Sequence, residues 1–426
     1  MVERLFRDEW GKMVATLTRI FGIEHLTLAE DVVQEALARA LQTWPFYGIP
    51  ENPSAWIMRV SRNLALDHAR RVSLFRHKEA EIAAFLEHPE TTELVFTEAE
   101  IQDDRLRMIF ACCHPQVPQD AQVALSLKTL CGFSTIEIAS AFLSSEAAVA
   151  KRLTRAKQRI REAQIPFEIP AGAELSARLE SVLQTLYLLF NEGYKASGGE
   201  RLVREELCHE AIRLATLVAG HPSCERPAVH ALLALMLLNA ARLPARTDPE
   251  GNLRLLEEQD RAQWDHEMIA RGMRHLAESA RGDAAGAYHL QAGIAACHCT
   301  ASDYASTDWP LILSLYDQLL EIDASPVIAL NRAVALANVQ GAQAGLDAAQ
   351  ALRAEGGLES YYLLHVVLGE LETRLGRLDA AAGHFRRALE RTEATAEREF
   401  LANKLRACES DVSAAARASV RLPGAP

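Results

Sequence analysis

The chain has 426 residues, of which 49% are hydrophobic and 24% charged, and this balance excludes a wholly disordered protein. Its length predicts two to four domains at ~100–200 residues each. The net charge of −12, taken alone, argues against nucleic-acid binding. The longest apolar runs, such as residues 231–238, fall far short of the ~18 residues that a membrane span needs, and the N-terminus has no signal-peptide pattern. We therefore expect a cytoplasmic protein.

Eight cysteines are too few for a disulfide framework in a chain of this length. Two short clusters, residues 112–114 and 297–299, combine Cys with His. Neither has the paired Cys-x-x-Cys or Cys/His spacing that structural zinc sites use. We expect buried thiols, no metal site and no cofactor.

Charge is segregated within the first 168 residues, which carry 20 Lys/Arg and 23 Asp/Glu. Residues 59–78 hold six bases and one acid, residues 79–104 hold nine acids and no base, and residues 151–161 hold six bases and no acid. This order predicts two nucleic-acid contacts separated by an acidic linker. On charge alone, two solvated helix faces and a polar linker are the favoured explanation of the pattern.

Helical periodicity dominates, so the fold class is predicted as all-α. The first strong helix covers residues 28–44, a Pro/Gly-rich loop is expected at 45–53, and a second helix starts at Ser54. On the second helix a basic arc adjoins the aromatic loop, an arrangement that suits single-stranded nucleic acid through stacking and backbone contacts. The alternative is that the aromatic residues belong to the core, which we favour for Trp44 and Trp56.

Residues 134–161 predict a helix-turn-helix. Ser134 and Glu137 form a capping box that opens a short helix over 135–142, and a second, basic helix follows from about residue 146. The helical wheel of the second helix places one apolar set inward: Val149, Leu153, Ala156 and Ile160. It places the opposite set outward: Ala147, Ala148, Lys151, Thr154, Arg155 and Gln158. Small residues near base edges and cations near phosphates would read duplex DNA, whereas an ordinary solvated basic helix is the alternative.

Helix follows helix from about residue 170 to the end of the chain. An apolar helix is expected to end in a polar, glycine-rich turn near Asn191, with Gly193 as a candidate C-cap. Between about 288 and 410, small and aromatic residues recur at tetratricopeptide (TPR) positions in three copies of about 34 residues. The recurrence predicts stacked helical hairpins.

Two segments of the first half, LAEDVVQEALARALQTW and NPSAWIMRVSRNLALDHARR, resemble region 2 of bacterial sigma factors of the extracytoplasmic-function type. The segment QVALSLKTLCGFSTIEIASAFLSSEAAVAKRLTRAKQRIREA resembles their region 4. The extension, including LYLLFNEGY and LGRLDAAAGHFRRAL, resembles the subgroup with a long helical C-terminal extension. One departure is Gly341-Ala342, where the subgroup has Gly-Pro.

The resemblance implies a region 2 domain over 1–78, an acidic linker over 79–104, a region 4 helix-turn-helix domain over 105–168 and a helical extension over 169–426. It implies RNA polymerase core, through the β′ clamp helices and the β flap, and promoter DNA as partners, with a small YCII-like protein as a further partner. The polymerase contacts are then Asp31, Gln34 and Glu35. Contacts to the −10 element are Phe46, Tyr47, Arg59, Arg62, Asn63, Arg70 and Arg71. Contacts to the −35 element are Ser145, Glu146, Ala147, Ala148, Lys151, Arg152 and Arg155.

The resemblance also implies that the extension regulates the sigma factor in cis, and we take Asn191, Glu192, Gly193 and Tyr194 as its regulatory contact. A DNA-binding regulator that recruits no polymerase and senses a signal through its repeats is the first alternative. An enzyme is the second, with catalytic groups among Asn191, Glu192, Tyr194, His209 and His298. The sequence shows no nucleophile–base pair, phosphate loop or metal spacing for it, so we expect no enzyme.

Overall fold

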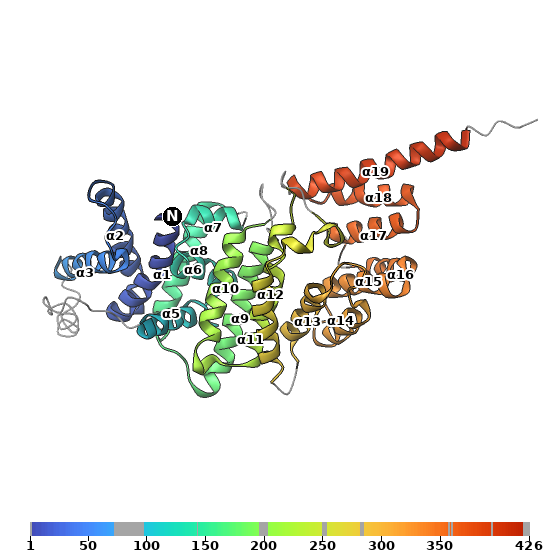
Figure 1. The fold of residues 1–426 in the computed structure, drawn as a ribbon. Coiled ribbons are helices and arrows are strands. Elements are labelled where there is room, and N and C mark those ends of the chain that lie inside the picture. Colours follow the sequence, from blue (N-terminus) through green and yellow to red (C-terminus); the bar gives the residue numbers. More distant parts are fainter. Residues whose placement is uncertain are drawn as a thin grey trace, which may run out of the picture. The chain divides into compact units, whose positions relative to one another are not determined.

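The computed structural model describes residues 2–71, 98–142, 144–195, 203–248, 254–281, 285–356, 358, 361–392 and 395–420. The elements of these residues are helices, as expected for an all-α protein (Figure 1). The chain forms two compact units, residues 1–189 and 190–426.

The first unit opens with three long helices, α1 (Val2–Phe21), α2 (Leu26–Tyr47) and α3 (Pro53–Arg71), with the 3-10 turn η1 (Ile23–His25) between the first two. The helix expected at 28–44 is confirmed as the central part of α2. Val32, Val33 and Ala36 are fully buried because Ala36 follows Val33 by three residues and Val32 by four, which places all three on one face. Trp44 is also buried and meets Trp56 edge to face at 5.6 Å, which places it in the core as favoured above.

The loop expected over residues 45–53 is shorter in the structure, because α2 continues through Pro45 to Tyr47. Pro45 lies in the last turn of the helix, so it removes only the single backbone bond to the Leu41 carbonyl and leaves the later bond from Gly48 to Trp44 in place. Gly48 ends the helix with a φ of +83°, and its N–H donates to the carbonyl of Trp44 at 2.9 Å. The helix α3 begins at Pro53, with the Asn52 side chain accepting a hydrogen bond from the Ala55 N–H at 3.0 Å.

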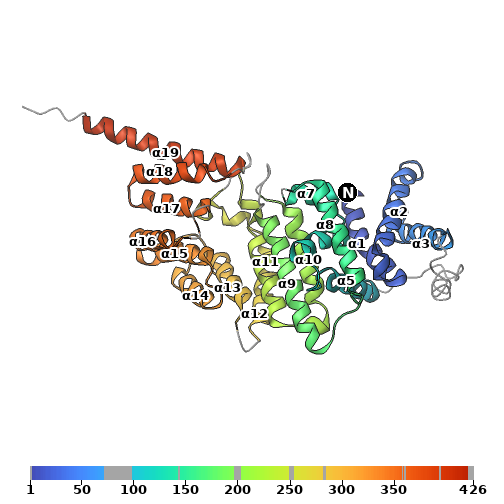
Figure 2. The same cartoon turned by 180° about the vertical axis from the view of Figure 1, so that it is seen from behind.

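The second half of this unit contains α5 (Glu98–Cys112), α6 (Gln119–Leu130), α7 (Thr135–Ala141) and α8 (Glu146–Glu162), followed by the start of α9 (Gly172–Tyr194). Residues 79–97 of the expected acidic linker lie outside the described residues, and residues 98–104 form the first turns of α5. Figure 2 shows α5, α7 and α8 beside α1 from behind.

The two halves of the first unit pack together, with α1 against α5 and α6. The Trp10 indole N–H donates to the Lys128 carbonyl at 3.0 Å. A Cβ atom on Gly11 would lie 2.2 Å from the Leu130 carbonyl oxygen, so only glycine permits this approach of α1 to α6. The contact joins the part of the chain expected as region 2 to the part expected as region 4.

The structure corrects the expectation for Gly193, which is a helical residue of α9 and not a C-cap. Its missing side chain lets α9 approach the start of α10 (Glu205–Ala219), where a Cβ would lie 2.6 Å from the Cys208 nitrogen. Its carbonyl also accepts a hydrogen bond from the Arg204 N–H at 2.8 Å. The glycine is therefore explained by packing between helices, which a local pattern does not reveal.

The second unit continues with η3 (Pro222–Cys224), α11 (Pro227–Ala240), η4 (Leu243–Ala245), η5 (Leu256–Glu258), η6 (Arg261–Gln263) and α12 (His266–Ser279). Residues 227–245 are long and apolar enough to cross a membrane by composition, but 72% of the apolar window is buried inside the protein. Such burial is what the core helix of a globular unit shows, and α11 packs against α10, α12 and α13 (Ala287–Thr300).

Three helical hairpins occupy the segment in which the repeats were predicted (Figure 1). These are α13 with α14 (Trp309–Ile322), α15 (Pro326–Gln340) with α16 (Ala342–Glu355), and α17 (Tyr362–Arg374) with α18 (Leu378–Leu389). The last helix, α19 (Thr395–Val420), packs against α18. Gly369 illustrates the repeat register, because a Cβ there would lie 2.7 Å from the ring of Phe385 on the next helix.

Candidate nucleic-acid interface

The basic helix α8 has the two faces that the sequence predicts. Val149, Leu153, Ala156 and Ile160 are at most 5% exposed. The outward residues are all exposed: Ala147, Ala148, Lys151, Thr154, Arg155 and Gln158. Ser145, also exposed, caps the helix by accepting a hydrogen bond from the Ala148 N–H at 3.2 Å. The exposed surface therefore begins with small residues at the positive end of the helix and continues with cations.

The turn that positions α8 is held by two local devices. The Ser134 hydroxyl accepts from the Glu137 N–H at 3.1 Å, and the Glu137 carboxylate accepts from the Ser134 N–H at 2.7 Å. The Thr135 hydroxyl donates to the carboxylate of Glu146 at 3.0 Å and so links α7 to the first turn of α8. The capping box is thus confirmed, and the paired helices have the geometry of a helix-turn-helix.

Three cations of α8 already have partners within the first unit. Arg152 pairs with Asp120 at 3.0 Å, Lys157 pairs with Glu30, and the Arg159 guanidinium donates to the Gln116 carbonyl at 3.4 Å. Lys151 and Arg155, by contrast, are exposed at the centre of the outward face. Of the three predicted DNA-contacting cations, Arg152 therefore contributes to the packing of α8, whereas Lys151 and Arg155 face outward.

A second exposed surface lies where α2 ends and α3 begins. Phe46 is 83% and Tyr47 86% exposed, an unusual state for large aromatic side chains. Arg59 and Asn63 are exposed on α3, whereas Arg62 is half-buried. Arg70 and Arg71 lie in the last turn of α3, and their side chains lie outside the described part. Exposed aromatics beside cations give this surface the means to stack on bases and contact phosphates.

The predicted polymerase contacts form one exposed strip on α2. Asp31, Gln34 and Glu35 are all exposed, and they lie opposite the buried face of the same helix. Glu35 pairs with Arg39 one turn later at 2.6 Å. Ion pairs between exposed residues four positions apart add little to the free energy of unfolding. The strip is therefore available to a partner.

One polar contact was not predicted from the sequence. Glu30, only 5% exposed, pairs with Lys157 of α8 and accepts a hydrogen bond from the Thr129 hydroxyl at 3.2 Å. It joins residues 127 positions apart in the chain. The one available signal was a charged residue on the buried face of α2, which calls for a partner.

Among the described residues no group of three or more His, Cys, Asp or Glu converges on one point. Cys112 and Cys113 are buried and reduced, and burial raises the pKa of both thiols, that of Cys113 to about 11. Burial also lowers the pKa of His114. All three groups are neutral at pH 7, and the two thiols belong to the core.

The residues expected to regulate the protein lie in the last turn of α9. Glu192 is buried, and the Arg246 guanidinium stacks 3.8 Å from the ring centre of Tyr194 and donates to its carbonyl. The next residue, Lys195, pairs at 3.7 Å with buried Glu397, which also accepts a hydrogen bond of 2.6 Å from the Thr392 hydroxyl. The end of α9 is therefore tied to the C-terminal repeats.

Three families match separate parts of this chain. Sigma-70 region 2 matches residues 8–74, sigma-70 region 4 matches residues 107–160, and a family of unknown function (DUF6596) matches residues 178–280. An uncharacterised protein of Rhizobium meliloti is 39% identical over 388 residues, covering 88% of each chain. A probable ECF RNA polymerase sigma factor, SigI of Mycobacterium tuberculosis, is 26% identical over 251 residues, covering 54% of this chain and 84% of its own length. No solved structure matches significantly.

Both sigma regions therefore occur in one chain, in order, on the two halves of the first compact unit. The chain belongs to the sigma-70 family as a sigma factor of the extracytoplasmic-function type, and it directs RNA polymerase to promoters. Region 2 argues against the alternative of a regulator that recruits no polymerase. Sigma factors are not enzymes, and their partners are RNA polymerase core and promoter DNA.

Proposed function

We propose that the outward face of α8 reads the −35 element and that the aromatic surface at the end of α2, with the cations of α3, binds the −10 element. The observation that carries the proposal is the division of α8 into a fully buried face and a fully exposed face. Ala147 and Ala148 would lie close to base edges, because they leave room in the major groove, and Lys151 and Arg155 would contact phosphates. Asp31, Gln34 and Glu35 would bind the polymerase clamp helices.

The −35 assignment can be tested by selecting duplexes from a randomised −35 library with the wild type and with Ala148→Leu. The larger side chain should change the preferred bases, whereas Lys151→Ala should weaken all sequences alike. An unchanged preference in Ala148→Leu would remove α8 from the base-reading surface.

The compact first unit does not span a promoter. Glu30 of α2 contacts Lys157 of α8. At ~1.5 Å per residue, Phe46 lies about 24 Å from Glu30 along α2. By the same rise, Lys151 lies about 9 Å from Lys157 along α8. The two proposed DNA surfaces are then at most ~50 Å apart with side chains included. Positions −10 and −35 are separated by about 25 base pairs, or ~85 Å of B-form DNA. We infer that regions 2 and 4 separate when the protein binds polymerase and promoter.

Energy transfer between labels on the exposed positions Ala38 and Gln158 tests this separation, with each residue first replaced by Cys. The native thiols interfere little because all except half-buried Cys299 are buried. Transfer should be high in the free protein and fall on addition of core polymerase. Equal transfer in both states would contradict the opening step.

The extension is acidic, with 34 Asp/Glu against 25 Lys/Arg over residues 169–426. We propose that it regulates the sigma factor in cis and that transcription requires it. Two physical models are possible: an acidic domain that masks the basic DNA surfaces, or a scaffold that supports region 4. Contacts between α9 and region 4 support the scaffold, as the Arg178 guanidinium donates to the Phe110 carbonyl at 3.1 Å and the Thr185 hydroxyl to the Gln122 side chain at 2.8 Å. We propose that the protein is cytoplasmic and that a YCII-like partner acts through the extension.

A further inference from the structure

The repeats of the second unit form a small pocket that the proposed promoter contacts do not use. It has a volume of about 290 Å³, and helices of all three hairpins contribute to its lining, with the short turn η5 at one side. Nine of its sixteen lining residues have apolar side chains, Trp309 among them. The space holds about ten water-sized groups at ~30 Å³ each. It therefore fits a small organic molecule with a mainly apolar body.

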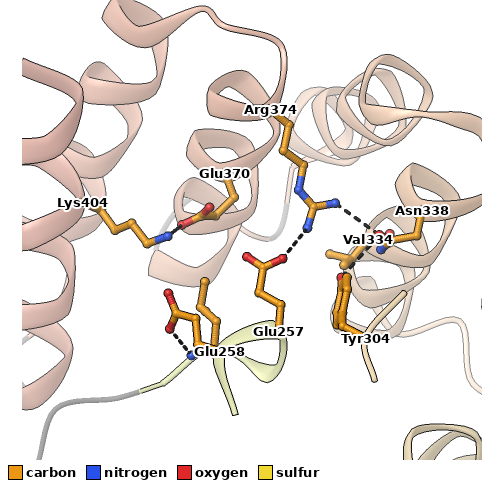
Figure 3. A network of polar contacts seen from close by, with 9 residues as sticks. Glu257, Glu258, Tyr304, Val334, Asn338, Glu370, Arg374 and Lys404 are labelled. Carbon is orange, nitrogen blue, oxygen red and sulfur yellow. Dashed lines mark hydrogen bonds and ion pairs between the residues drawn. The ribbon is translucent and has the colours of Figure 1, made fainter. Parts of the chain in front are cut away.

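The ionised side chains that line this pocket already have partners of opposite charge. Glu257 pairs with Arg374 at 3.8 Å, and Glu370 pairs with Lys404 of α19 at 3.0 Å (Figure 3). Arg374 also donates to the Asn338 side chain at 3.3 Å. Because each carboxylate has a cation beside it, neither an ammonium group nor a carboxylate of a ligand would meet an unpaired counter-charge from these residues.

The imidazole of His298, which also lines the pocket, is uncharged at pH 7. Burial, and then the charges of Arg242 and Arg261, lower its pKa to about 3. Neither guanidinium belongs to the lining that the described residues form. A charged ligand would therefore lose its hydration in this pocket without gaining an unpaired partner, which costs free energy. The lining favours an uncharged ligand.

Two uncharged polar groups of the lining have no hydrogen-bond partner among the described residues: the Tyr316 hydroxyl on α14 and the Asn331 amide on α15. Burial raises the pKa of Tyr316 to about 12, so its hydroxyl keeps its proton and can donate it. The Arg332 guanidinium donates to the Asp317 carboxylate at 2.5 Å. Because these two residues directly follow Asn331 and Tyr316 in the chain, the two unpartnered groups lie at the same level of neighbouring helices. A few polar groups in an apolar pocket are what orients a bound small molecule.

We propose that this pocket binds an uncharged small molecule of about ten non-hydrogen atoms that has a flat apolar body and one amide group. The body lies against Trp309, whose ring is held in place by Tyr304, with ring centres 5.1 Å apart at 60°. The amide accepts a hydrogen bond from the Tyr316 hydroxyl and pairs with the Asn331 side chain. This site is independent of the proposed promoter contacts, and its ligand contacts helices of all three hairpins.

Calorimetric titration of the full-length protein with three compounds of matched shape tests the charge preference: phenylacetamide, phenethylamine and phenylacetate. Phenylacetamide should bind at least tenfold more tightly than either charged compound, because it alone enters the pocket without an unpaired charge. Absence of saturable phenylacetamide binding, or binding of either charged compound within threefold of it, would overturn the proposal.

Two variants assign the binding to this pocket. Tyr316→Phe removes only the hydroxyl and should weaken phenylacetamide about fivefold, because one hydrogen bond to the ligand is lost. Tyr361→Phe makes the same change outside the pocket lining and is the matched control, which should bind as the wild type does. Val334→Trp should fill the pocket and abolish binding. Should Val334→Trp fail to fold, Tyr316→Phe decides alone: an affinity equal to that of Tyr361→Phe contradicts the site.

Discussion

Lys151 and Arg155 differ from the other cations of α8 because they are exposed and central on its outward face. In a duplex carrying the −35 element, Lys151→Ala and Arg155→Ala should each weaken binding and lower the slope of log K against log salt by roughly one, as one phosphate contact is lost. The measurement is fluorescence anisotropy over a salt series.

Arg159→Ala provides the control, because this residue lies on the flank of the same helix and contacts the Gln116 carbonyl. It should leave the salt slope within error of the wild-type value. If the two central variants retain both affinity and slope, the docking face of α8 has been misassigned.

The Glu30–Lys157 contact predicts an effect on stability at a single residue. Lys157→Met leaves a carboxylate that is 5% exposed without its cation, and we expect a loss of about 2 kcal/mol in the free energy of unfolding of the first unit. Lys157 is itself partly exposed, which holds the loss below that of a fully buried pair. Urea unfolding followed by circular dichroism measures it.

Lys151→Met, on the exposed face of the same helix, should change the free energy of unfolding by less than about 0.5 kcal/mol. The double variant Glu30→Gln, Lys157→Met should recover part of the loss, because no buried charge remains. Equal stability of Lys157→Met and Lys151→Met would show that the pair contributes nothing.

At the scale of elements, the last repeat hairpin depends on close contact between α17 and α18. Gly369→Ala places a methyl group 2.7 Å from the Phe385 ring, which should cost about 2 kcal/mol through overpacking. Gly383→Ala, on α18 with nothing within 4 Å of its Cβ, should instead stabilise the helix by up to ~1 kcal/mol. Opposite shifts of the unfolding midpoint are expected, and shifts of the same sign would contradict this account of the hairpin.

The same hairpin contains two buried histidines, His365 and His384, whose Nδ1 atoms are 3.3 Å apart. Burial and then nearby charges lower both pKa values, that of His384 to about 4, so both rings are neutral in the folded state. The charged neighbours are Arg353, Arg387, Arg391 and Glu390.

Because the unfolded chain takes up these protons near pH 6.5, the stability that the neutral pair contributes is present above that value and is lost as the pH falls toward 4. Thermal melts at pH 7.5, 6.0 and 5.0 should show a falling midpoint, and His384→Gln should flatten the dependence. An equally steep dependence in that variant would exclude the pair as its source.

At the scale of the whole molecule, the extension is predicted to be required for transcription. A truncation after residue 189 keeps the α9 contacts to region 4, which a cut at 168 would remove. We expect the 1–189 chain to bind core polymerase but to transcribe at least fivefold less than the full chain, and Glu192→Ala with Tyr194→Ala to show the same defect. Run-off transcription measures both.

Transcription by the 1–189 chain equal to that of the full chain would show that the extension is dispensable, and increased transcription would support the masking model. Far-ultraviolet circular dichroism of each variant separates loss of function from loss of fold.

Features that depend on neighbouring residues were predictable without a structure. The capping box at Ser134, the two faces of α8 and the three hairpins were predictable because helix caps, 3.6-residue periodicity and repeat spacing are local. The family resemblance rested on the same segments. The expected end of α2 was wrong by one turn because Pro45 removes a single backbone hydrogen bond in the last turn and does not end the helix.

The folded structure was needed to establish which distant residues meet. It paired Glu30 with Lys157, placed Gly193 inside a helix contact, and brought His298, Glu257 and Trp309 around one pocket. Each of these depends on side chains from separate helices converging in space, and no pattern within one segment specifies such a partner. Periodicity states which face of a helix is buried, whereas packing decides what that face is buried against.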